Sequence, residues 1–310
     1  MIFKKPLFWD YKKPNLLSYF LLPLTLPIII RNFFFTTLKK KKFPEIKTIC
    51  VGNIYLGGTG KTPLCIKIYE ILKEKNFNIA TVKKFYKNQK DEQLLLQKKT
   101  TTIIADTRKE AVLESIKKKY AVLIFDDGLQ DSQIDYDKKL VCFKSNNWIG
   151  NGQIIPAGPL REKISSLKRF DAIFLNGNKD NNKELKEKIL RINSNIKIFQ
   201  TSYKISDINK YDLNSEYLIF SGIGEPKDFK NLLIENGFKI KKEIIFSDHF
   251  EYTSKEINKI LDLAKNENLK ILTTEKDYMK LSQSLNKEIS FLDIDLEIEN
   301  QKELINFLLN

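Results

Sequence analysis

The chain has 310 residues, which suits one large domain or two of modest size, and 42% hydrophobic with 30% charged residues is typical of a globular protein with a core. Its 53 basic and 39 acidic residues leave a net charge of +14. This surplus indicates an anionic partner, which could be a nucleotide, a nucleic acid or an acidic membrane surface. A composition rich in lysine along the whole chain explains the charge equally well. Three scattered cysteines argue against a disulfide framework or a cysteine-rich zinc site, the single histidine excludes a multi-histidine metal site, and we expect a protein of the cytosol or facing it.

The first notable segment is strongly apolar. "NLLSYFLLPLTLPIII" (15–30) is followed by Arg31, by three phenylalanines at 33–35 and by four lysines at 39–42. The run is shorter than the roughly 20 residues of a membrane span and contains two prolines, and no small-residue cleavage site of a signal peptide follows it. We predict an interfacial helix or hairpin, with its apolar side in the membrane and its lysines on anionic headgroups. The alternative is a helix packed onto the domain.

From about residue 46 short apolar runs alternate with segments of helical spacing. Strands are predicted at 47–54, 77–82, 101–105, 120–128, 139–143, 170–177 and 197–205, and helices from 64 onward, at 108–119 and at 184–193. Such alternation implies parallel βαβ units and an open sheet that is covered on both faces.

The same pattern restarts near residue 216. Strands are predicted from 216, at 242–250 and at 269–277, and helices at 226–237 and 254–266, the latter with a capping box of Thr253 and Glu256. We therefore predict an α/β protein of three parts: an apolar and basic N-terminal segment at 1–43, a larger domain at 44–210, which the glycine-rich loop described next makes P-loop NTPase-like, and a smaller α/β domain at 211–310.

"YLGGTGKTPL" (55–64) has the features of a phosphate-binding loop. Gly57, Gly58 and Gly60 lie between a predicted strand and a predicted helix and precede Lys61 and Thr62. Glycines let backbone N–H groups turn toward phosphate oxygens, and the helix N-terminus adds its positive end. In such loops the lysine reaches the β- and γ-phosphates and the hydroxyl holds Mg²⁺. The usual first glycine is a tyrosine here, but the Gly-Lys-Thr end carries the phosphate contacts. The alternative is a glycine-rich turn with an incidental Lys-Thr pair.

"AVLIFDDGLQ" (121–130) supplies the acidic partner that such a loop requires. Asp126 and Asp127 end a buried apolar run, and a carboxylate at the end of a strand beside the P-loop strand orients Mg²⁺ directly or through water. Adjacent residues point in different directions, so we expect one aspartate to serve the metal and the other a neighbouring group. An Asp-Gly turn would account for Asp127 and Gly128, but it explains Asp126 less well.

Four stretches together resemble one family: "VGNIYLGGTGKTP" (51–63), "DDGLQ" (126–130), "GNGQIIPAGPLRE" (150–162) and "TTEKD" (273–277). In this order and spacing they look like the tetraacyldisaccharide 4'-kinase family of lipid A biosynthesis, over nearly the whole chain. The resemblance implies a Mg²⁺-dependent P-loop kinase on the cytoplasmic face of the bacterial inner membrane. Such a kinase moves the γ-phosphate of ATP to the 4'-hydroxyl of a lipid A disaccharide 1-phosphate and forms lipid IVA. We expect a monomer without a nucleic-acid partner.

The resemblance also implies site residues. Its ATP-binding positions are Tyr55, Leu56, Gly57, Gly58, Thr59, Gly60, Lys61 and Thr62, and family members likewise lack a glycine at the Tyr55 position. Asp126 and Asp127 match the acidic pair near Mg²⁺, and Glu162 matches the glutamate that closes the Pro-Ala-Gly-Pro-Leu-Arg-Glu motif. The predicted metal-binding residues are Thr62, Asp126, Asp127 and Glu162.

Catalytic residues follow from the same resemblance. His249 in "SDHF" and Asp91 in "KDEQLLL" match a histidine and an aspartate that are taken to activate the acceptor hydroxyl, and Lys61 completes the predicted catalytic set. From the residues alone, His249 is a lone histidine after a strand and Asp91 is a charge in a polar loop. A carboxylate–imidazole pair suits the chemistry, because a sugar hydroxyl must lose its proton as it attacks phosphorus.

The departures from the family pattern lie on the acceptor side. Residues 83–86 replace a usual Ser-Arg-Gly-Tyr, and Asp131 and Phe250 each replace a usual histidine. Two other classes of function compete with this interpretation. A P-loop transferase or ligase-like ATPase with a soluble substrate would not need the apolar N-terminus. A basic nucleic-acid-binding protein is disfavoured because the lysines are scattered and no aromatic-basic stripe is present.

Overall fold

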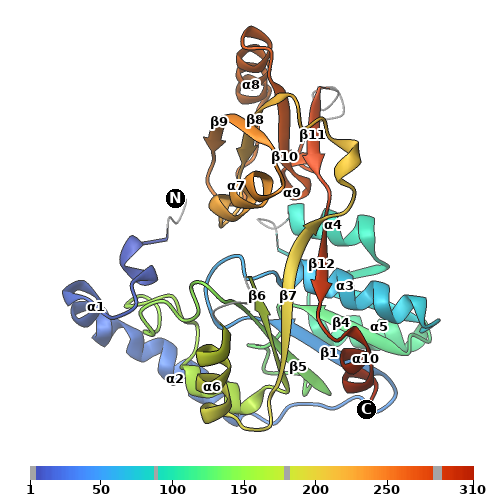
Figure 1. Cartoon of the computed structure of the whole chain (residues 1–310). Coiled ribbons are helices and arrows are strands. Elements are labelled where there is room, and N and C mark those ends of the chain that lie inside the picture. The colour runs from blue at the N-terminus through green and yellow to red at the C-terminus, as the bar shows by residue number, and fades with distance from the viewer. Residues whose placement is uncertain (1–4, 87–89, 178–181, 282–287) are drawn as a thin grey trace. The chain divides into compact units, whose positions relative to one another are not determined.

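The computed structural model describes residues 5–86, 90–177, 182–281 and 288–310, and the chain forms two compact units (Figure 1). The large unit contains the described residues within Phe3–Phe85, Lys99–Ser202 and Leu296–Asn310. The small unit contains those within Tyr86–Lys98 and Tyr203–Asp295. This grouping differs from the predicted boundaries at 43/44 and 210/211, because residues 86–98 belong to the small unit and the C-terminal residues return to the large one. Periodicity marks an element, but not the unit against which it packs.

In the described part of the chain, the large unit is built on an eight-stranded sheet. Its order is β12 (Ile294–Ile298), β7 (Lys197–Ile205), β6 (Ala172–Asn176), β5 (Lys138–Lys144), β1 (Lys47–Gly52), β4 (Val122–Asp126), β2 (Ile79–Lys84) and β3 (Thr102–Ala105). From β7 to β3 all neighbours are parallel, as the alternating pattern predicted. At the edge β12 runs against β7, since Glu299 N–H bonds the Gln200 carbonyl while Ser206 N–H bonds the Asp293 carbonyl. The predicted P-loop NTPase-like α/β class is confirmed.

Helices of the large unit follow from the apolar spacing of the sequence. They are α3 (Lys61–Glu74), α5 (Arg108–Lys117), α6 (Asn182–Ile192) and α10 (Gln301–Leu309), with a 3-10 turn η4 (Ile164–Arg169). The apolar face of α3, which includes Leu64, Ile68 and Leu72, is buried against β1, β2 and β4. Helix α5 begins at a capping box in which the Thr107 hydroxyl accepts the Glu110 N–H. The final helix was not predicted.

The N-terminal segment is helical through most of its length. It comprises η1 (Leu7–Asp10), α1 (Leu16–Leu21), η2 (Leu22–Thr25) and α2 (Leu26–Thr37), and the prolines lie in the first turns of η2 and α2, where a missing N–H costs no helical bond. Leu16–Thr37 is 22 residues long, and by length and composition alone it could cross a membrane. It exceeds the apolar run of the sequence because the three phenylalanines extend the helix beyond Arg31.

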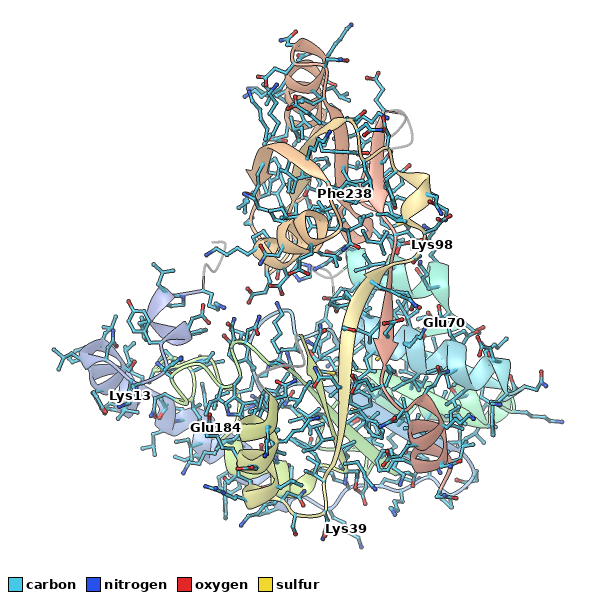
Figure 2. The ribbon with its side chains drawn as sticks, viewed as in Figure 1. Lys13, Lys39, Glu70, Lys98, Glu184 and Phe238 are labelled. Atoms are coloured by element: carbon cyan, nitrogen blue, oxygen red, sulfur yellow. The ribbon has the colours of Figure 1, made fainter. Side chains whose placement is uncertain are left out.

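Most large apolar side chains of this segment are exposed, although Ile28 and Ile29 pack against the core, and several of its polar side chains are turned inward. Ser18 and Thr25 are buried, the Ser18 hydroxyl accepts a bond from the Asn151 amide at 3.0 Å, and the Asn32 amide donates to the Arg161 carbonyl at 2.7 Å. The exposed side chains are Leu16, Leu17, Tyr19, Phe20, Leu24, Leu26, Ile30, Phe33, Phe34 and Leu38. Lys13 and Lys39, both labelled in Figure 2, flank the segment in the sequence and are exposed. A helix packed onto the domain by its apolar face would show the opposite pattern.

The small unit has a four-stranded sheet within the described residues. Its order is β11 (Ile289–Leu292), β10 (Lys270–Thr274), β8 (Glu216–Ser221) and β9 (Lys239–Ile245), all parallel. Its helices are α4 (Lys90–Lys99), α7 (Pro226–Glu235), α8 (Ser254–Asn266) and α9 (Glu275–Tyr278), with a 3-10 turn η5 (Ile208–Lys210). The predicted capping box of Thr253 and Glu256 is present at α8. Phe238, labelled in Figure 2, packs in the core against Tyr211 and Tyr217.

Helix α4 corrects one expectation. Asp91 was predicted to lie in a polar loop, but it lies in the first turn of this helix. The sequence of α4 is mostly charged and polar around its leucines, so its apolar spacing is too weak to distinguish a helix from a loop.

Candidate active site

The glycine-rich loop joins β1 to α3 in the large unit, at the carboxyl edge of the sheet where parallel α/β proteins bind ligands. Gly57 and Gly60 have φ values of 139° and 87°, which side-chain-bearing residues rarely adopt, and Gly60 is the N-cap of α3. The Asn53 amide braces the loop from inside by donating to the Gly57 carbonyl at 3.2 Å and to the Thr59 hydroxyl at 3.0 Å. These contacts hold the loop open in the shape that a phosphate group requires.

The first two residues of the predicted nucleotide-binding stretch form hydrogen bonds with other segments of the chain. The Tyr55 ring is buried, and its hydroxyl donates to Asp10 Oδ1 at 2.6 Å. The Leu56 N–H donates to the Pro159 carbonyl at 2.8 Å. Of the predicted nucleotide-binding residues, Gly57 to Thr62 therefore form the loop proper, while Tyr55 and Leu56 fasten its entrance to neighbouring segments.

Thr62 and Asp126 are in contact at the end of the P-loop. The Thr62 hydroxyl donates to Asp126 Oδ2 at 2.9 Å, and the Lys83 ammonium lies 2.7 Å from the same oxygen. Asp126 and Lys83 meet because they are register partners on β4 and β2. Both side chains are fully buried. The other carboxylate oxygen, Oδ1 of Asp126, is buried and has no hydrogen-bond partner among the described residues.

Asp127 points to a different set of groups, as expected for adjacent residues. The Arg161 guanidinium lies 3.1 and 3.3 Å from its two oxygens, and Asp127 itself has a φ of 63°, a strained value for a residue with a side chain. Burial opposes ionisation of this carboxyl, but the charges of Lys61, Arg161 and Lys83 outweigh burial and hold the pKa of Asp127 well below its usual range. Asp127 is therefore an anion at the base of the P-loop.

Glu162 lies beyond this arginine. It accepts a bond from the Gln130 amide at 3.0 Å and is ion-paired with Arg169, while Arg161 donates to Gln130 Oε1 at 3.3 Å. The predicted metal-binding residues thus fall into two groups, Thr62 with Asp126 and Asp127 with Glu162. Over the described ranges, no three His, Cys, Asp or Glu residues are clustered as ligands of one metal ion.

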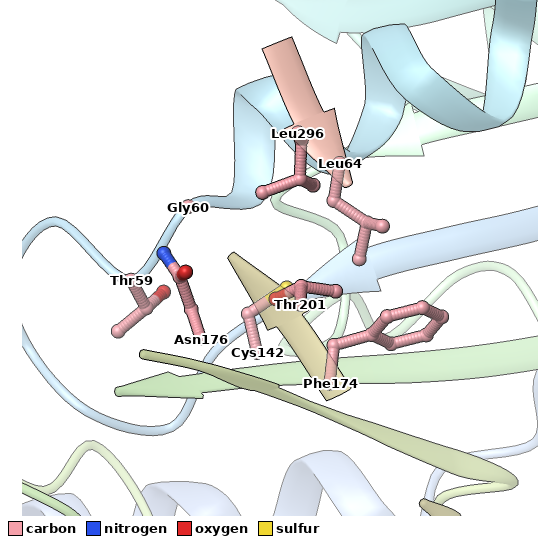
Figure 3. A pocket seen from close by; sticks show the side chains of 8 residues that line it. All are labelled: Thr59, Gly60, Leu64, Cys142, Phe174, Asn176, Thr201 and Leu296. Atoms are coloured by element: carbon pink, nitrogen blue, oxygen red, sulfur yellow. The ribbon is translucent and has the colours of Figure 1, made fainter. Parts of the chain in front are cut away.

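Figure 3 shows a small pocket beside the P-loop, within the large unit. Thr59 and Gly60 of the loop and Leu64 of α3 line one part of it, and residues of β5, β6, β7 and β12 line the rest. Its lining residues are Thr59, Gly60, Leu64, Cys142, Phe174, Asn176, Thr201 and Leu296. The pocket extends the groove of the P-loop along the carboxyl edge of the sheet with mostly apolar side chains and the polar groups of Asn176 and Thr201.

In the small unit, Asp91 and His249 form a direct pair although 158 residues separate them in the sequence. His249 Nδ1 lies 3.1 and 3.0 Å from the two oxygens of Asp91, whose side chain is buried. Burial opposes ionisation, but the His249 hydrogen bond and the charges of Lys276 and Lys280 hold the pKa of Asp91 well below its usual range. With Nδ1 turned to the carboxylate, Nε2 is the ring nitrogen left for proton transfer.

The residues that replace usual family residues form contacts of their own. Asp131 lies 3.0 Å from Arg108, Lys83 pairs with Asp126, and Phe250 packs on Phe246 with ring centroids 4.7 Å apart. These three departures are therefore accommodated locally by an ion pair or an aromatic contact.

Several site residues were not predicted. Gln130, Arg161 and Lys276 lie inside the motifs quoted above, but nothing in the residues indicated what each would contact. Nothing in the sequence indicated the contacts of Lys83 and Lys280, because one lysine in a lysine-rich chain cannot be distinguished from the others until its burial is known.

A parallel sheet whose first strand runs through a Gly-x-Gly-Lys-Thr loop into a helix, beside a strand that ends in aspartate, defines a P-loop nucleotide-binding protein. Residues 16–310 match the profile of the family described as "LpxK: Tetraacyldisaccharide-1-P 4'-kinase". The chain belongs to this family.

Similar proteins agree with this membership. The chain is 47% identical over 311 residues to the tetraacyldisaccharide 4'-kinase of Pelagibacter ubique, covering 100% of this chain and 98% of that protein. It is 33% identical to the protein of the same name from Rickettsia akari, over 97% of this chain and 95% of that one. Among solved structures, LpxK from Aquifex aeolicus in complex with ATP shares the fold, with a TM-score of 0.71, 23% identity, and coverage of 95% and 99% of the two chains.

Proposed function

We propose that this protein is an ATP-dependent kinase that transfers the γ-phosphoryl group of ATP to the 4'-hydroxyl of a tetraacyldisaccharide 1-phosphate and forms lipid IVA. The observation that carries the proposal is the P-loop that ends in a threonine hydroxyl bonded to a buried aspartate, in a chain 47% identical over its whole length to a protein named for this activity. A P-loop alone would indicate only a nucleotide-binding protein.

The large unit binds the nucleotide. Backbone N–H groups of the loop from Gly57 to Thr62 surround the phosphates, and the N-terminus of α3 adds its positive end. Lys61, the first residue of α3, places its ammonium on the β- and γ-phosphates, where charge develops during transfer. Tyr55 and Leu56 contribute by fixing the loop entrance rather than by touching phosphate.

The residues around Asp126 fit a hydrated Mg²⁺. A buried carboxylate oxygen without a partner, beside a threonine hydroxyl, offers the oxygen donors that this ion prefers. When bound, Mg²⁺ neutralises charge on the β- and γ-phosphate oxygens. Thr62 and Asp126 would be its ligands from the chain, and Asp127 and Glu162 would support the site through their ion pairs with Arg161 and Arg169.

Asp91 and His249 prepare the acceptor. The carboxylate fixes the ring so that Nδ1 carries the proton and Nε2 accepts the proton of the sugar hydroxyl, and it stabilises the imidazolium that results. Both residues lie in the small unit, so the pair is assembled by the fold of one unit.

Transfer to lipid tests the proposal directly. The purified full chain in detergent micelles, with tetraacyldisaccharide 1-phosphate, Mg²⁺ and ATP labelled at the γ position, is expected to move the label to the lipid, and EDTA is expected to stop the transfer. Normal ATP binding without labelled lipid would contradict the proposal. Labelling of a soluble acceptor instead would favour the alternative of a P-loop transferase with a soluble substrate.

The N-terminal segment, helical through most of residues 7–37, binds the cytoplasmic surface of the inner membrane in this proposal. Its support is the outward apolar face described above, of which the most apolar stretch is only 11% buried, and the basic residues at 39–42 that can contact anionic headgroups. A lipid acceptor explains why the protein would bind a membrane, because such a substrate is confined to the membrane.

Changing the apolar face is expected to release the protein from membranes. Serine at Phe20, Phe33 and Phe34 together removes three exposed rings, and each is expected to weaken binding to anionic liposomes about tenfold, since burying a Phe side chain is worth about 1.5–3 kcal/mol. Sedimentation with vesicles measures the change. The matched control places serine at Leu113, Leu190 and Ile234, which are also exposed apolar residues but lie on other helices, and is expected to bind like the unaltered chain. Equal loss in both variants would contradict a specific membrane face.

A further inference from the structure

The "TTEKD" stretch has no part in the chemistry above, yet it forms a closely bonded structure in the small unit. The Thr274 hydroxyl accepts the Asp277 N–H at 3.1 Å and donates to Asp277 Oδ2 at 2.7 Å. The same oxygen accepts the Gly222 N–H at 2.9 Å, and the Gly222 carbonyl accepts the His249 N–H at 3.2 Å. A Cβ at Gly222 would lie 2.9 Å from the Tyr252 hydroxyl, so only glycine fits there. Helix α9 and His249 are thus fastened to one glycine.

Two ammonium groups from this region lie against Asp91. Lys276 Nζ is 3.4 Å from Asp91 Oδ2 and 3.3 Å from Asp248 Oδ1, and it lies 3.8 Å from Glu92. Lys280 Nζ is 3.5 Å from the same Asp91 oxygen and 2.9 Å from Asp277 Oδ1. The carboxylate that contacts the imidazole is therefore also contacted by two cations, both at Oδ2.

We propose that Lys276 and Lys280 are positioning residues, which keep the Asp91 carboxylate ionised and aimed at Nδ1 of His249 and offset its negative charge at the ring. The inference rests on the proposed function, because it gives the two lysines a purpose only if the Asp91–His249 pair accepts a proton. Cations beside Asp91 favour its ionised form and reduce the negative potential that this carboxylate exerts at the ring.

The charged and titratable groups around the pair determine the sign of the effect. Glu92 comes from α4, Asp248 from the loop after β9, Tyr252 from the approach to α8, and Lys276, Asp277 and Lys280 from α9 and the turn that follows it. Burial opposes the charge on Lys276, but Asp248, Asp91 and Glu92 outweigh burial and raise the pKa of Lys276, so it remains a cation. Removing one of the two cations makes the surroundings more negative, so the pair takes up a proton at higher pH.

The single histidine of the chain makes the test direct. In the full chain in detergent micelles, the titration of the His249 Hε1 resonance can be followed by NMR without any substrate. For Lys276→Met we expect the midpoint to rise by roughly one pH unit, because a cation that contacts the carboxylate partner of the ring is removed. Lys276→Arg keeps the charge and is expected to restore the midpoint. In the transfer assay, the acidic limb of the kcat/KM profile should move by the same amount.

Lys255→Met is the matched control, because it removes an exposed lysine from α8 of the same unit and should leave the midpoint unchanged. An unchanged midpoint in folded Lys276→Met, or an equal rise in Lys255→Met, would overturn the inference. Should Lys276→Met fail to fold, Lys280→Met gives the same test through the cation at 3.5 Å. Because the titration needs no acceptor, failure of the proposed activity shows in the lipid assay and failure of the inference shows in the NMR titration.

Discussion

Replacing Lys61 with alanine is expected to reduce phosphoryl transfer at least a thousandfold. Loss of a single neutral donor to a developing oxyanion costs about 10²–10³ in kcat, and Lys61 is a full charge at the position where a P-loop contacts the β- and γ-phosphates. Its charge contributes to holding the pKa of Asp127, at the base of the loop, below its usual range. Initial rates with labelled ATP and the lipid acceptor measure the change.

Lys73→Ala supplies the control for this result. Lys73 lies in the last turn of the same helix α3 and is exposed, so its removal changes the net charge equally but leaves the loop untouched. We expect rates within about twofold of the unaltered chain, as for most surface substitutions. Retention of more than a tenth of the activity by Lys61→Ala would remove Lys61 from the catalytic set.

Replacing His249 with alanine is expected to lower kcat by about 10²–10⁴, the usual worth of a positioned general base, while the Kd for ATP changes less than twofold. The reason for the split is location. His249 and its partner lie in the small unit, whereas the P-loop groups lie in the large unit. Single-turnover transfer and ATP titration measure the two quantities separately.

Asp91→Asn and the double variant complete this prediction. If the carboxylate acts only through the ring, Asp91→Asn should lose most of the same rate, and adding it to His249→Ala should cost little more, since residues that act as a unit are not additive. Equal losses of ATP affinity and turnover in His249→Ala would instead assign the histidine to nucleotide binding.

A helix or strand was predictable where its own residues are enough to identify it. β7 and α8 have the predicted bounds, and the capping box at Thr253 is present, because alternation, helical spacing and capping are local properties. The P-loop was predictable for the same reason: its residues are consecutive, and the chemistry of each is read from its type. The position of Asp126 beside the P-loop could be predicted from a strand that ends in aspartate, on the assumption that this strand lies next to β1. The sheet order confirms that β4 and β1 are neighbours.

The rest of the fold and of the candidate site depends on which segments of the chain come into contact. The ion pair of Lys83 with Asp126 exists because β2 and β4 are neighbours in register, and no pattern in either strand records that register. The polar surroundings of Asp91 gave no sign that its helix would pack in the small unit, and the contact of Asp91 with His249 was predictable only through resemblance to a family. Tyr55 is a third case: its hydroxyl bond to Asp10 shows that the position of the usual glycine serves here to attach the loop to the N-terminal segment.

The path of the chain between its two units also limits how the molecule can be divided. Among the residues that the structure describes, the chain passes from one unit to the other at 85/86, 98/99, 202/203 and 295/296, so this part of the small unit is assembled from two separate stretches. An expressed fragment that starts at residue 203 would contain His249 and both lysines of the "TTEKD" region, but it would lack α4 and with it Asp91. A single proteolytic cut therefore cannot yield two intact modules, and exchange of this unit between relatives would have to transplant both stretches at once.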